Sequence, residues 1–232
     1  MGFLTATAVA ITRIFLVCAE VEFRGASRMA IYEDYFEYQN ISKALDTSDV
    51  YWLYSSNFDM KKSDKDCVYF KFQNVSEHGI NFYSGYKKNN ESGRVDYTGI
   101  FYSLPMVAKN NSVVDRNTSN AVYVNSQSGL TSSQARNFSL IFSHNRKCLI
   151  FLVLTKPILK QKMPANLDTY ENRCIILLRD SEARIGINAT TSTKNVCQNV
   201  FYNACIKYNK DIFRKLFSNT CSSPEIKELP AC

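Results

Sequence analysis

Eight short apolar or alternating runs, separated by polar stretches rich in Asn, Ser, Lys and Gly, constrain the fold of this chain most. In the early runs apolar side chains alternate with polar ones, as Phe70 and Phe72 alternate with Lys71 and Gln73. Such alternation predicts strands with one face in a core and the other toward solvent. The runs are Val50–Tyr54, Cys67–Asn74, Gly79–Tyr86, Arg94–Tyr102, Ala121–Asn125, Asn137–Ser143, Lys147–Leu154 and Arg173–Arg179.

Two of the late runs, 149–154 and 174–178, are apolar on both faces. A strand in an antiparallel sheet has this composition when something covers its outer side. A helix predicted over Thr193–Asn209 can provide the cover, because its apolar residues recur at helical spacing. Cys197 and Cys205 fall on one stripe of this helix, and we expect that stripe to face the sheet.

A further amphipathic helix is predicted before the first strand, over Ile31–Leu45. Eight antiparallel strands can close into a barrel that either fills with side chains or holds one small ligand, as lipocalins do. The sequence therefore predicts a mainly β fold: an eight-stranded antiparallel up-and-down lipocalin barrel, with an N-terminal helix and a C-terminal helix packed on the outside.

The first residues, Met1–Ala19, are typical of a secretory signal peptide. The apolar stretch Phe3–Val17 is interrupted by Arg13, and small or apolar residues precede the expected cleavage after Ala19. A buried or anchoring helix is the alternative, but this stretch is too short and too broken to span ~30 Å of hydrocarbon. No second apolar run of membrane length follows. We therefore expect a secreted, extracellular protein whose residues 20–232 form one soluble domain without a membrane segment.

Sequons and cysteines agree with export. Eight cysteines suit an oxidising compartment, and seven remain once Cys18 leaves with the signal peptide. The odd number predicts one unpaired thiol, for which the terminal Cys232 is the candidate. A zinc site is the alternative, but the chain has no C-x-x-C and only His78 and His144, so we expect disulfides and no metal. Predicted glycosylation sites are Asn40, Asn74, Asn90, Asn110, Asn117, Asn137 and Asn188.

The charge and the motifs exclude several classes of function. The formal net charge of +7 is spread over basic residues that stand singly or in pairs such as Lys61 and Lys62, which does not indicate a nucleic-acid partner. The chain has no Gly-x-Ser-x-Gly and no glycine-rich phosphate loop, so neither catalysis nor a cofactor is expected.

In order and spacing, these segments resemble the tick salivary lipocalins, the tick histamine-binding protein family, from about Ile31 to Cys221. The matching pieces are Lys43-Ala44-Leu45-Asp46, Val50-Tyr51-Trp52-Leu53, Cys67, Phe138–Phe142, Lys147-Cys148-Leu149-Ile150, Cys174-Ile175-Ile176-Leu177, the helix with Cys197, Phe201 and Cys205, and Asn219-Thr220-Cys221.

The resemblance implies three disulfides, although sequence alone leaves the connectivity open. They are Cys67–Cys221, Cys148–Cys197 and Cys174–Cys205. The second would hold the C-terminal helix against the barrel wall.

The resemblance also bears on the ligand. Family members that sequester histamine or serotonin place carboxylates in an aromatic cavity, because a buried ammonium must be paired. Leu149, Ile175 and Leu177 stand where the amine binders have Asp, Glu and Trp, so an amine site there is disfavoured. An amine pocket built from Glu33, Asp34, Glu37 or Asp59 is the alternative, with those residues on solvated surfaces as the simpler explanation.

An apolar interior suits a lipid such as a leukotriene or a fatty acid, whose carboxylate a cation near the mouth would orient. Arg179 lies an even number of residues from Ile175 and Leu177, so its side chain should point to the same face of the strand, and it is the first candidate. An ordinary exposed strand-end arginine is the simpler explanation. Arg94 and Lys109 are weaker candidates. The predicted ligand-binding residues, which also suit plain core packing, are Trp52, Phe70, Phe72, Phe82, Tyr97, Phe101, Phe151, Ile175, Leu177 and Arg179.

The leading hypothesis is a monomeric secreted lipocalin that captures a small host mediator and dampens inflammation or haemostasis during feeding. The ligand is a lipid in the favoured version and a biogenic amine such as histamine or serotonin in the less favoured one. The alternative is an inhibitor that binds a host plasma protein of complement or clotting through surface loops, for which the connection Lys156–Thr169 is suited.

Overall fold

A closed antiparallel barrel forms the centre of the molecule. The computed structural model describes residues 25–59, 66–88, 91–127, 136–155, 172–186, 192–207 and 213–222. Within these ranges the barrel strands are β1 (Val50–Ser56), β2 (Asp66–Val75), β3 (Gly79–Lys88), β4 (Glu91–Tyr102), β7 (Ala121–Ser126), β8 (Arg136–His144), β9 (Cys148–Leu154) and β10 (Cys174–Arg179). Each strand pairs with the next, and β10 also pairs with β1, so the sheet closes. The predicted up-and-down barrel is confirmed, and all eight runs form strands at the expected places.

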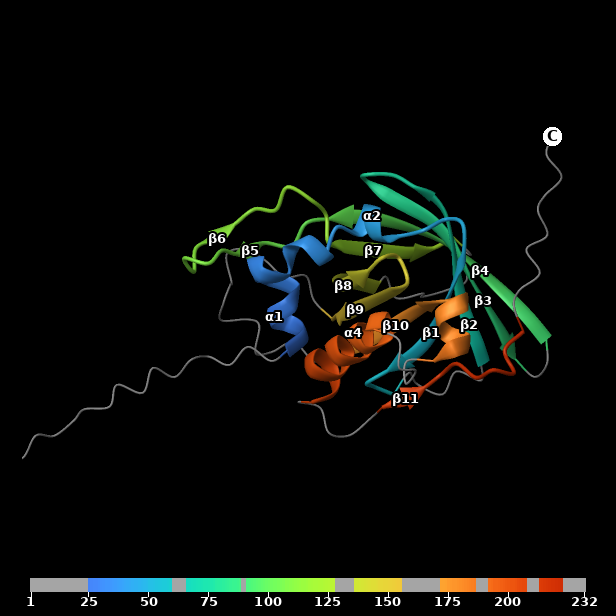
Figure 1. Ribbon diagram of the computed structural model, residues 1–232. Coiled ribbons are helices and arrows are strands. Elements are labelled where there is room, and N and C mark those ends of the chain that lie inside the picture. The colour runs from blue at the N-terminus through green and yellow to red at the C-terminus, as the bar shows by residue number, and fades with distance from the viewer. Residues whose placement is uncertain are drawn as a thin grey trace, which may run out of the picture.

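Shorter elements surround the barrel. Figure 1 shows α1 and the β5–β6 hairpin at one side, while the long strands β3 and β4 reach to the other. These elements are α1 (Gly25–Ile31), the 3-10 helix η1 (Glu33–Tyr38), α2 (Ile41–Ala44), β5 (Met106–Val107), β6 (Val113–Val114), α3 (Asp180–Ile185), α4 (Ser192–Phe201), the π-helix η4 (Tyr202–Ile206) and β11 (Arg214–Lys215), which pairs with the end of β1.

The predicted single helix over Ile31–Leu45 is wrong, because this segment contains the end of α1 and two further short helical turns. Tyr32 is extended and forms a bridge with Val107, which ends α1. Asn40 is extended as well, and its side-chain oxygen accepts a hydrogen bond from Lys43 N at 3.1 Å. Asn favours such caps over helix interiors, since its short side chain competes for backbone partners.

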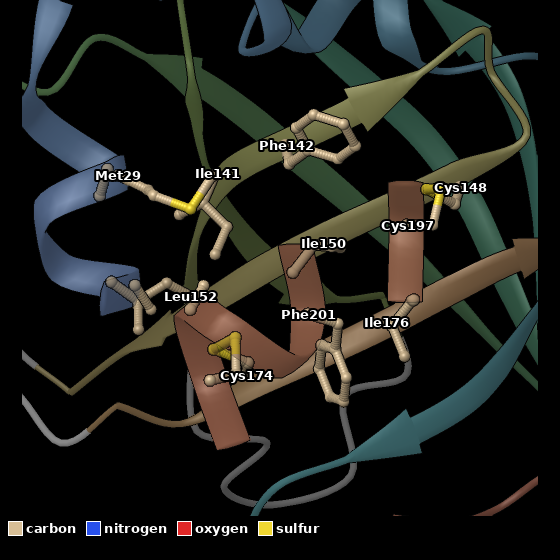
Figure 2. Packing of buried hydrophobic residues seen from close by; sticks show 14 of the residues in the cluster. Met29, Ile141, Phe142, Cys148, Ile150, Leu152, Cys174, Ile176, Cys197 and Phe201 are labelled. Carbon is tan, nitrogen blue, oxygen red and sulfur yellow. A yellow bond between two sulfur atoms is a disulfide. The ribbon is translucent and has the colours of Figure 1, made fainter. Parts of the chain in front are cut away.

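Two apolar clusters lie on opposite faces of the barrel wall. Alternate residues of each strand point inward, and on β9 these are Leu149 and Phe151. The intervening residues Ile150 and Leu152 point outward into a second cluster, under α1 and α4. Figure 2 shows this outer cluster, with α4 crossing over β9 and β10. The predicted cover of the late strands by the C-terminal helix is therefore confirmed. An N-terminal helix also packs on the outside as predicted, but it is α1, which lies earlier in the chain than the predicted Ile31–Leu45.

One end of the barrel is closed by α2. Ile41, Ala44 and Leu45 are buried in the same cluster as the inward residues of the strands. The chain reaches this end at the start of β1 and at the end of β10. The opposite end carries the tip of the β3–β4 pair and β11. We call it the open end, because within the described residues no helix packs across it into the interior cluster.

Six cysteines of the described residues form the three disulfides that the family resemblance implies. The bond Cys148–Cys197 attaches α4 to β9, and Cys174–Cys205 attaches the π-helix to β10. The bond Cys67–Cys221 joins segments 154 residues apart in the sequence. Each constrains the unfolded chain and typically adds about 2 to 4 kcal/mol to stability.

Several predictions concern residues outside the described ranges: the signal peptide Met1–Ala19, Cys18, Cys232, Asn90, Asn188 and the connection Lys156–Thr169. Of the other sequons, Asn74, Asn110 and Asn117 are exposed, whereas Asn40 and Asn137 are half-buried. Glycosylation itself stays a prediction. Among the described helices, none is both long and apolar enough to span a bilayer.

Candidate ligand site

The barrel interior contains a cavity of about 70 Å³. Seven of the barrel strands contribute to its wall, and the described side chains that line it are all aliphatic or aromatic. They are Phe70, Phe72, Ile80, Phe82, Phe101, Val122, Val124, Phe138, Phe151 and Leu177. Such a wall offers dispersion and hydrophobic contact but no charge to pair with a polar ligand.

Six of the ten residues that line the cavity are phenylalanines. The ring of Phe82 stacks on Tyr97 at 5.1 Å between centroids and lies 6.2 Å from Phe70 and 6.1 Å from Phe72. Pockets for drug-sized ligands usually measure roughly 300 to 1,000 Å³. A cavity of about 70 Å³ is much smaller, so a lipid can enter only if some of these rings change rotamer.

Six of the ten predicted ligand-binding residues lie around this cavity: Phe70, Phe72, Phe82, Phe101, Phe151 and Leu177. Tyr97 and Ile175 belong to the interior cluster beside it. The structure thus brings eight of the predicted side chains together inside the barrel.

Trp52 is placed on the other face of the wall, so its predicted position in the cavity is wrong. It is 1% exposed in the outer cluster, with its ring 5.4 Å from Tyr69 and 5.2 Å from Phe217. Its Nε1 donates to Asp180 Oδ1 at 2.6 Å. Because Tyr51 and Leu53 point inward, Trp52 between them must point outward.

Arg179 has the predicted inward parity but lies at the closed end, not near a mouth. It pairs with Tyr51 in the β1–β10 register, and its guanidinium forms ion pairs with Asp49 and Asp46. The hydrogen bond to the Asp49 carboxylate and the charge of both aspartates outweigh burial and raise the pKa of Arg179. Burial raises the pKa of the neighbouring Tyr51 phenol. Asp46 and Asp49 thus pair with Arg179, whereas the Tyr51 hydroxyl donates to Arg146 O, and Arg179 is not among the residues that line the cavity.

The interior positions at which the family resemblance implies amine-binding residues are aliphatic in this chain. Leu149 and Leu177 pair directly across β9 and β10, and both are at most 4% exposed in the interior cluster. The alternative carboxylates lie elsewhere. Glu33 accepts a hydrogen bond from Lys109 N at 3.0 Å, Asp34 and Glu37 are exposed, and Asp59 pairs with Arg214 at 2.9 Å.

The weaker cation candidates also lie outside the interior. Arg94 packs on the outer face of β4, with its guanidinium carbon 3.9 Å from the centre of the Tyr83 ring and an ion pair to Asp96. Lys109 is exposed. The described part of the chain holds no group of three or more His, Cys, Asp or Glu side chains suited to bind a metal.

Four lining residues were not predicted: Ile80, Val122, Val124 and Phe138. Each has inward parity on a run that was correctly expected to be a strand. Val122 and Val124 alternate with outward residues of β7, for instance, and the exposed Tyr123 separates them. The position of each residue within its run, which decides the face of the sheet that its side chain points to, was therefore the signal that could have identified them.

A closed up-and-down barrel of eight antiparallel strands, with an apolar interior plugged at one end, defines a lipocalin-type binding protein. The chain belongs to the tick histamine-binding protein family, whose sequence model matches residues 30–223. The fold and the family are those of proteins that bind small molecules.

Solved structures of similar fold have low sequence identity to this chain. The AM182–serotonin complex is 14% identical over 80% of this chain and 93% of its own, with a TM-score of 0.49. Japanin from Rhipicephalus appendiculatus, bound to cholesterol, is 11% identical over 70% of this chain and 89% of its own, with a TM-score of 0.42. Lobster apocrustacyanin A1 is 8% identical over 73% and 76%, also with a TM-score of 0.42. No curated protein matches the chain.

Proposed function

We propose that this protein is a secreted, glycosylated lipocalin that sequesters a small apolar host mediator, of the kind of a leukotriene or a fatty acid. The observation that carries the proposal is the wholly apolar wall of the interior cavity. The family supplies the general function of small-molecule binding. Capture of such a mediator by this protein would dampen inflammation or haemostasis in the host.

The wall composition favours a lipid over an amine for an energetic reason. An ammonium ion brought among Phe72, Phe101 and Leu177 would lose its hydration and gain no carboxylate in return. Attraction to the aromatic faces recovers only ~0.5–2 kcal/mol. A hydrocarbon tail instead gains about 25 cal/mol for each Å² of apolar surface that it removes from water.

Sequestration requires no reaction. A protein of this kind acts at a stoichiometric ratio, and its effect depends on its concentration and on slow release of the ligand. The proposed ligand contacts are the residues that line the cavity together with Tyr97 and Ile175 beside it.

The test is native mass spectrometry of the secreted, deglycosylated protein, with arachidonate, leukotriene B4, histamine and serotonin offered in competition. We expect a lipid retained at 1:1 in the wild type and lost in Leu177→Trp, which fills the cavity from β10. The matched control is Tyr123→Trp, since Tyr123 is 37% exposed on the outer face of β7. Tight capture of an amine by the wild type would contradict the proposal.

The small size of the cavity supports a second candidate function. A volume of about 70 Å³ also suits a filled barrel that serves as a scaffold. The protein would then inhibit a host plasma protein of complement or clotting through its loops. Absence of any bound small molecule in the same experiment, followed by capture of one defined complement or clotting component from plasma, would favour this candidate.

A further inference from the structure

We infer that the Ser84 hydroxyl, on the inner face of β3, hydrogen-bonds a hydroxyl group of the ligand, so that the protein prefers hydroxylated lipids to the same lipids without the hydroxyl. This inference rests on the proposed function, because it assigns a polar contact within the same barrel interior. Ser84 is not among the predicted ligand-binding residues, which are aromatic or aliphatic apart from Arg179.

The backbone of β3 directs the Ser84 side chain into the barrel. Ile80 and Phe82 line the cavity, and Ser84 follows them at the same two-residue spacing. The pairing of β3 with β4 has no register shift along the strand, so no bulge turns Ser84 outward. On its other side, Ser84 lies opposite Phe70, which also lines the cavity. Ser84 therefore belongs to the interior, at the edge of the cavity.

The Ser84 hydroxyl is buried but forms no hydrogen bond with any described residue, although Ser84 is only 6% exposed. Other buried serines of the barrel have partners. Ser55 donates to Arg214 O at 2.7 Å. Ser56 donates to Phe58 O at 3.0 Å. A buried hydroxyl without a partner destabilises the folded protein, so a ligand that supplied the partner would gain affinity from it.

Ser139 carries another buried hydroxyl without a partner, but it faces the other way. It pairs with Ala121 and Leu152, both of which pack in the outer cluster. The Ser139 oxygen is fully enclosed there, whereas the Ser84 oxygen keeps some accessible surface. Of these two hydroxyls, that of Ser84 is the one placed to meet a ligand in the barrel.

A lipid in this barrel has to reach Ser84. The cavity of about 70 Å³ is too small for such a ligand, which must move some interior rings and extend beyond the present wall. Ser84 lies next to that wall, between Phe70 and the stacked rings of Phe82 and Tyr97. A plain hydrocarbon chain would leave the Ser84 hydroxyl unpartnered, whereas a chain with a hydroxyl would satisfy it among side chains that exclude competing water.

The neutral hydroxyl suits this position better than an ionised carboxylate does. A carboxylate would also accept a hydrogen bond from Ser84, but it would lose more hydration among the aromatic rings than one hydrogen bond returns. Four residues of strand separate Ser84 from Ile80, the lining residue of β3 nearest the closed end, which corresponds to about 13 Å at ~3.3 Å per residue. This depth suits a hydroxyl near the middle of a long-chain fatty acid or at the head of a shorter fatty alcohol.

The experiment compares two pairs of lipids on the full-length protein, with dissociation constants from competition against a fluorescent fatty acid. The pair of 10-hydroxystearate and stearate tests a hydroxyl in the chain, and the pair of 1-tetradecanol and 1-chlorotetradecane tests a hydroxyl at the head. We expect the wild type to bind the hydroxylated member of at least one pair about fivefold more tightly, as one neutral hydrogen bond allows.

Variants assign the preference to Ser84. In Ser84→Ala the affinity for the hydroxylated lipid should fall about fivefold and that for its partner should stay the same. Ser84→Thr keeps the hydroxyl and should keep the preference. The control is Thr98→Val, which removes a hydroxyl from the outer face of β4, next to the inward Tyr97.

The stability of the ligand-free protein provides a second measurement. A hydroxyl without a partner contributes nothing to the empty barrel, so Ser84→Ala should unfold at the same temperature as the wild type or at a higher one. A fall of more than about 4 °C would mean that the hydroxyl has a structural partner, and would overturn the inference.

The binding outcomes separate the two proposals. Equal binding within both pairs by the wild type, or a preference that survives in Ser84→Ala, would overturn the contact with Ser84 and leave the lipid-binding function intact. Failure of the wild type to bind any of the four lipids would overturn the function as well.

Discussion

The side chain of Asn57 accepts a hydrogen bond from the backbone N–H of Cys174 at 2.7 Å. Its amide also donates to Asn172 O and, at 2.6 Å, to Cys205 O. Asn57 is 1% exposed and stands directly after β1, so one side chain joins β1, β10 and the C-terminal π-helix beside the Cys174–Cys205 disulfide. A buried amide whose donor and acceptor sides are both used ties the closing strands to the helix that covers them.

Asn57→Ala should lower the free energy of unfolding by about 2 to 4 kcal/mol. The reason is that buried backbone groups of Cys174 and Cys205 would lose their partner, at roughly 1 to 3 kcal/mol for each unsatisfied group. Guanidinium denaturation with the disulfides intact measures the change. Asn81→Ala, at an exposed position of β3, is the control and should change stability by no more than about 0.5 kcal/mol. A loss for Asn57→Ala equal to that of the control would contradict the role of Asn57.

Trp52 should report on the outer cluster and not on the ligand. It is the sole tryptophan of the chain and is 1% exposed between the barrel wall and Phe217. We expect short-wavelength emission and weak quenching by acrylamide in the folded protein, and strong quenching after unfolding with reductant. A saturating lipid should leave the emission nearly unchanged. Quenching of Trp52 in proportion to ligand occupancy would contradict its placement outside the cavity.

Phe82→Ala should enlarge the cavity and widen the range of lipids bound. The Phe82 ring contacts Phe70, Phe72 and Tyr97, so its removal frees the centre of the interior. The expected loss of stability is about 3 to 5 kcal/mol, typical of a buried phenylalanine. Competition binding with a linear and a branched fatty acid measures the gain for the bulkier ligand.

The neighbouring residue provides the control for this variant. Tyr83 lies next on β3 and faces outward against Arg94, so Tyr83→Ala should leave the ligand range as it is. A thermal melt of both variants shows that each remains folded. If the two variants have the same ligand range, the rings inside the barrel do not limit access.

The strands and the inner lining were predictable because alternation is a local property. Phe70, Phe72 and Phe82 each stand on a run with one polar face, and all three line the cavity. The run Val50–Tyr54 is apolar on both faces, so its pattern could not tell whether Trp52 or Leu53 faces the barrel interior. Its direction depends on the covering elements, which are remote in sequence.

The ends of the barrel could not be predicted for a similar reason. The parity of Arg179 was correct, but which end of the barrel is closed depends on where α2 packs. The segment before β1 has an amphipathic pattern that suits one helix, and Asn40 divides it through its cap on Lys43 N.

Acid should weaken the closed end of the barrel through Asp46. Burial alone would raise the pKa of this carboxyl, but hydrogen bonds from the Ser48 N–H at 3.0 Å and the Ser48 hydroxyl at 2.7 Å, together with the charge of Arg179, lower it below the ordinary 3.8. A folded pKa below the unfolded one means that the unfolded chain binds more protons in this range. The stabilisation by Asp46 is therefore complete above the unfolded pKa and is lost as the pH falls through the folded pKa.

Asp46→Asn should remove this part of the acid dependence, because the amide oxygen can still accept from Ser48 but carries no charge for Arg179. Denaturation is measured at pH values from about 7 to about 2. The wild type should have a higher free energy of unfolding than the variant, by a constant amount at the upper end of this range and by a shrinking amount below about pH 4. Asp34→Asn, at an exposed position of η1, is the control and should follow the wild type throughout. A difference between wild type and Asp46→Asn that grows toward acid would mean that the carboxyl is destabilising when charged, against the contacts with Ser48 and Arg179.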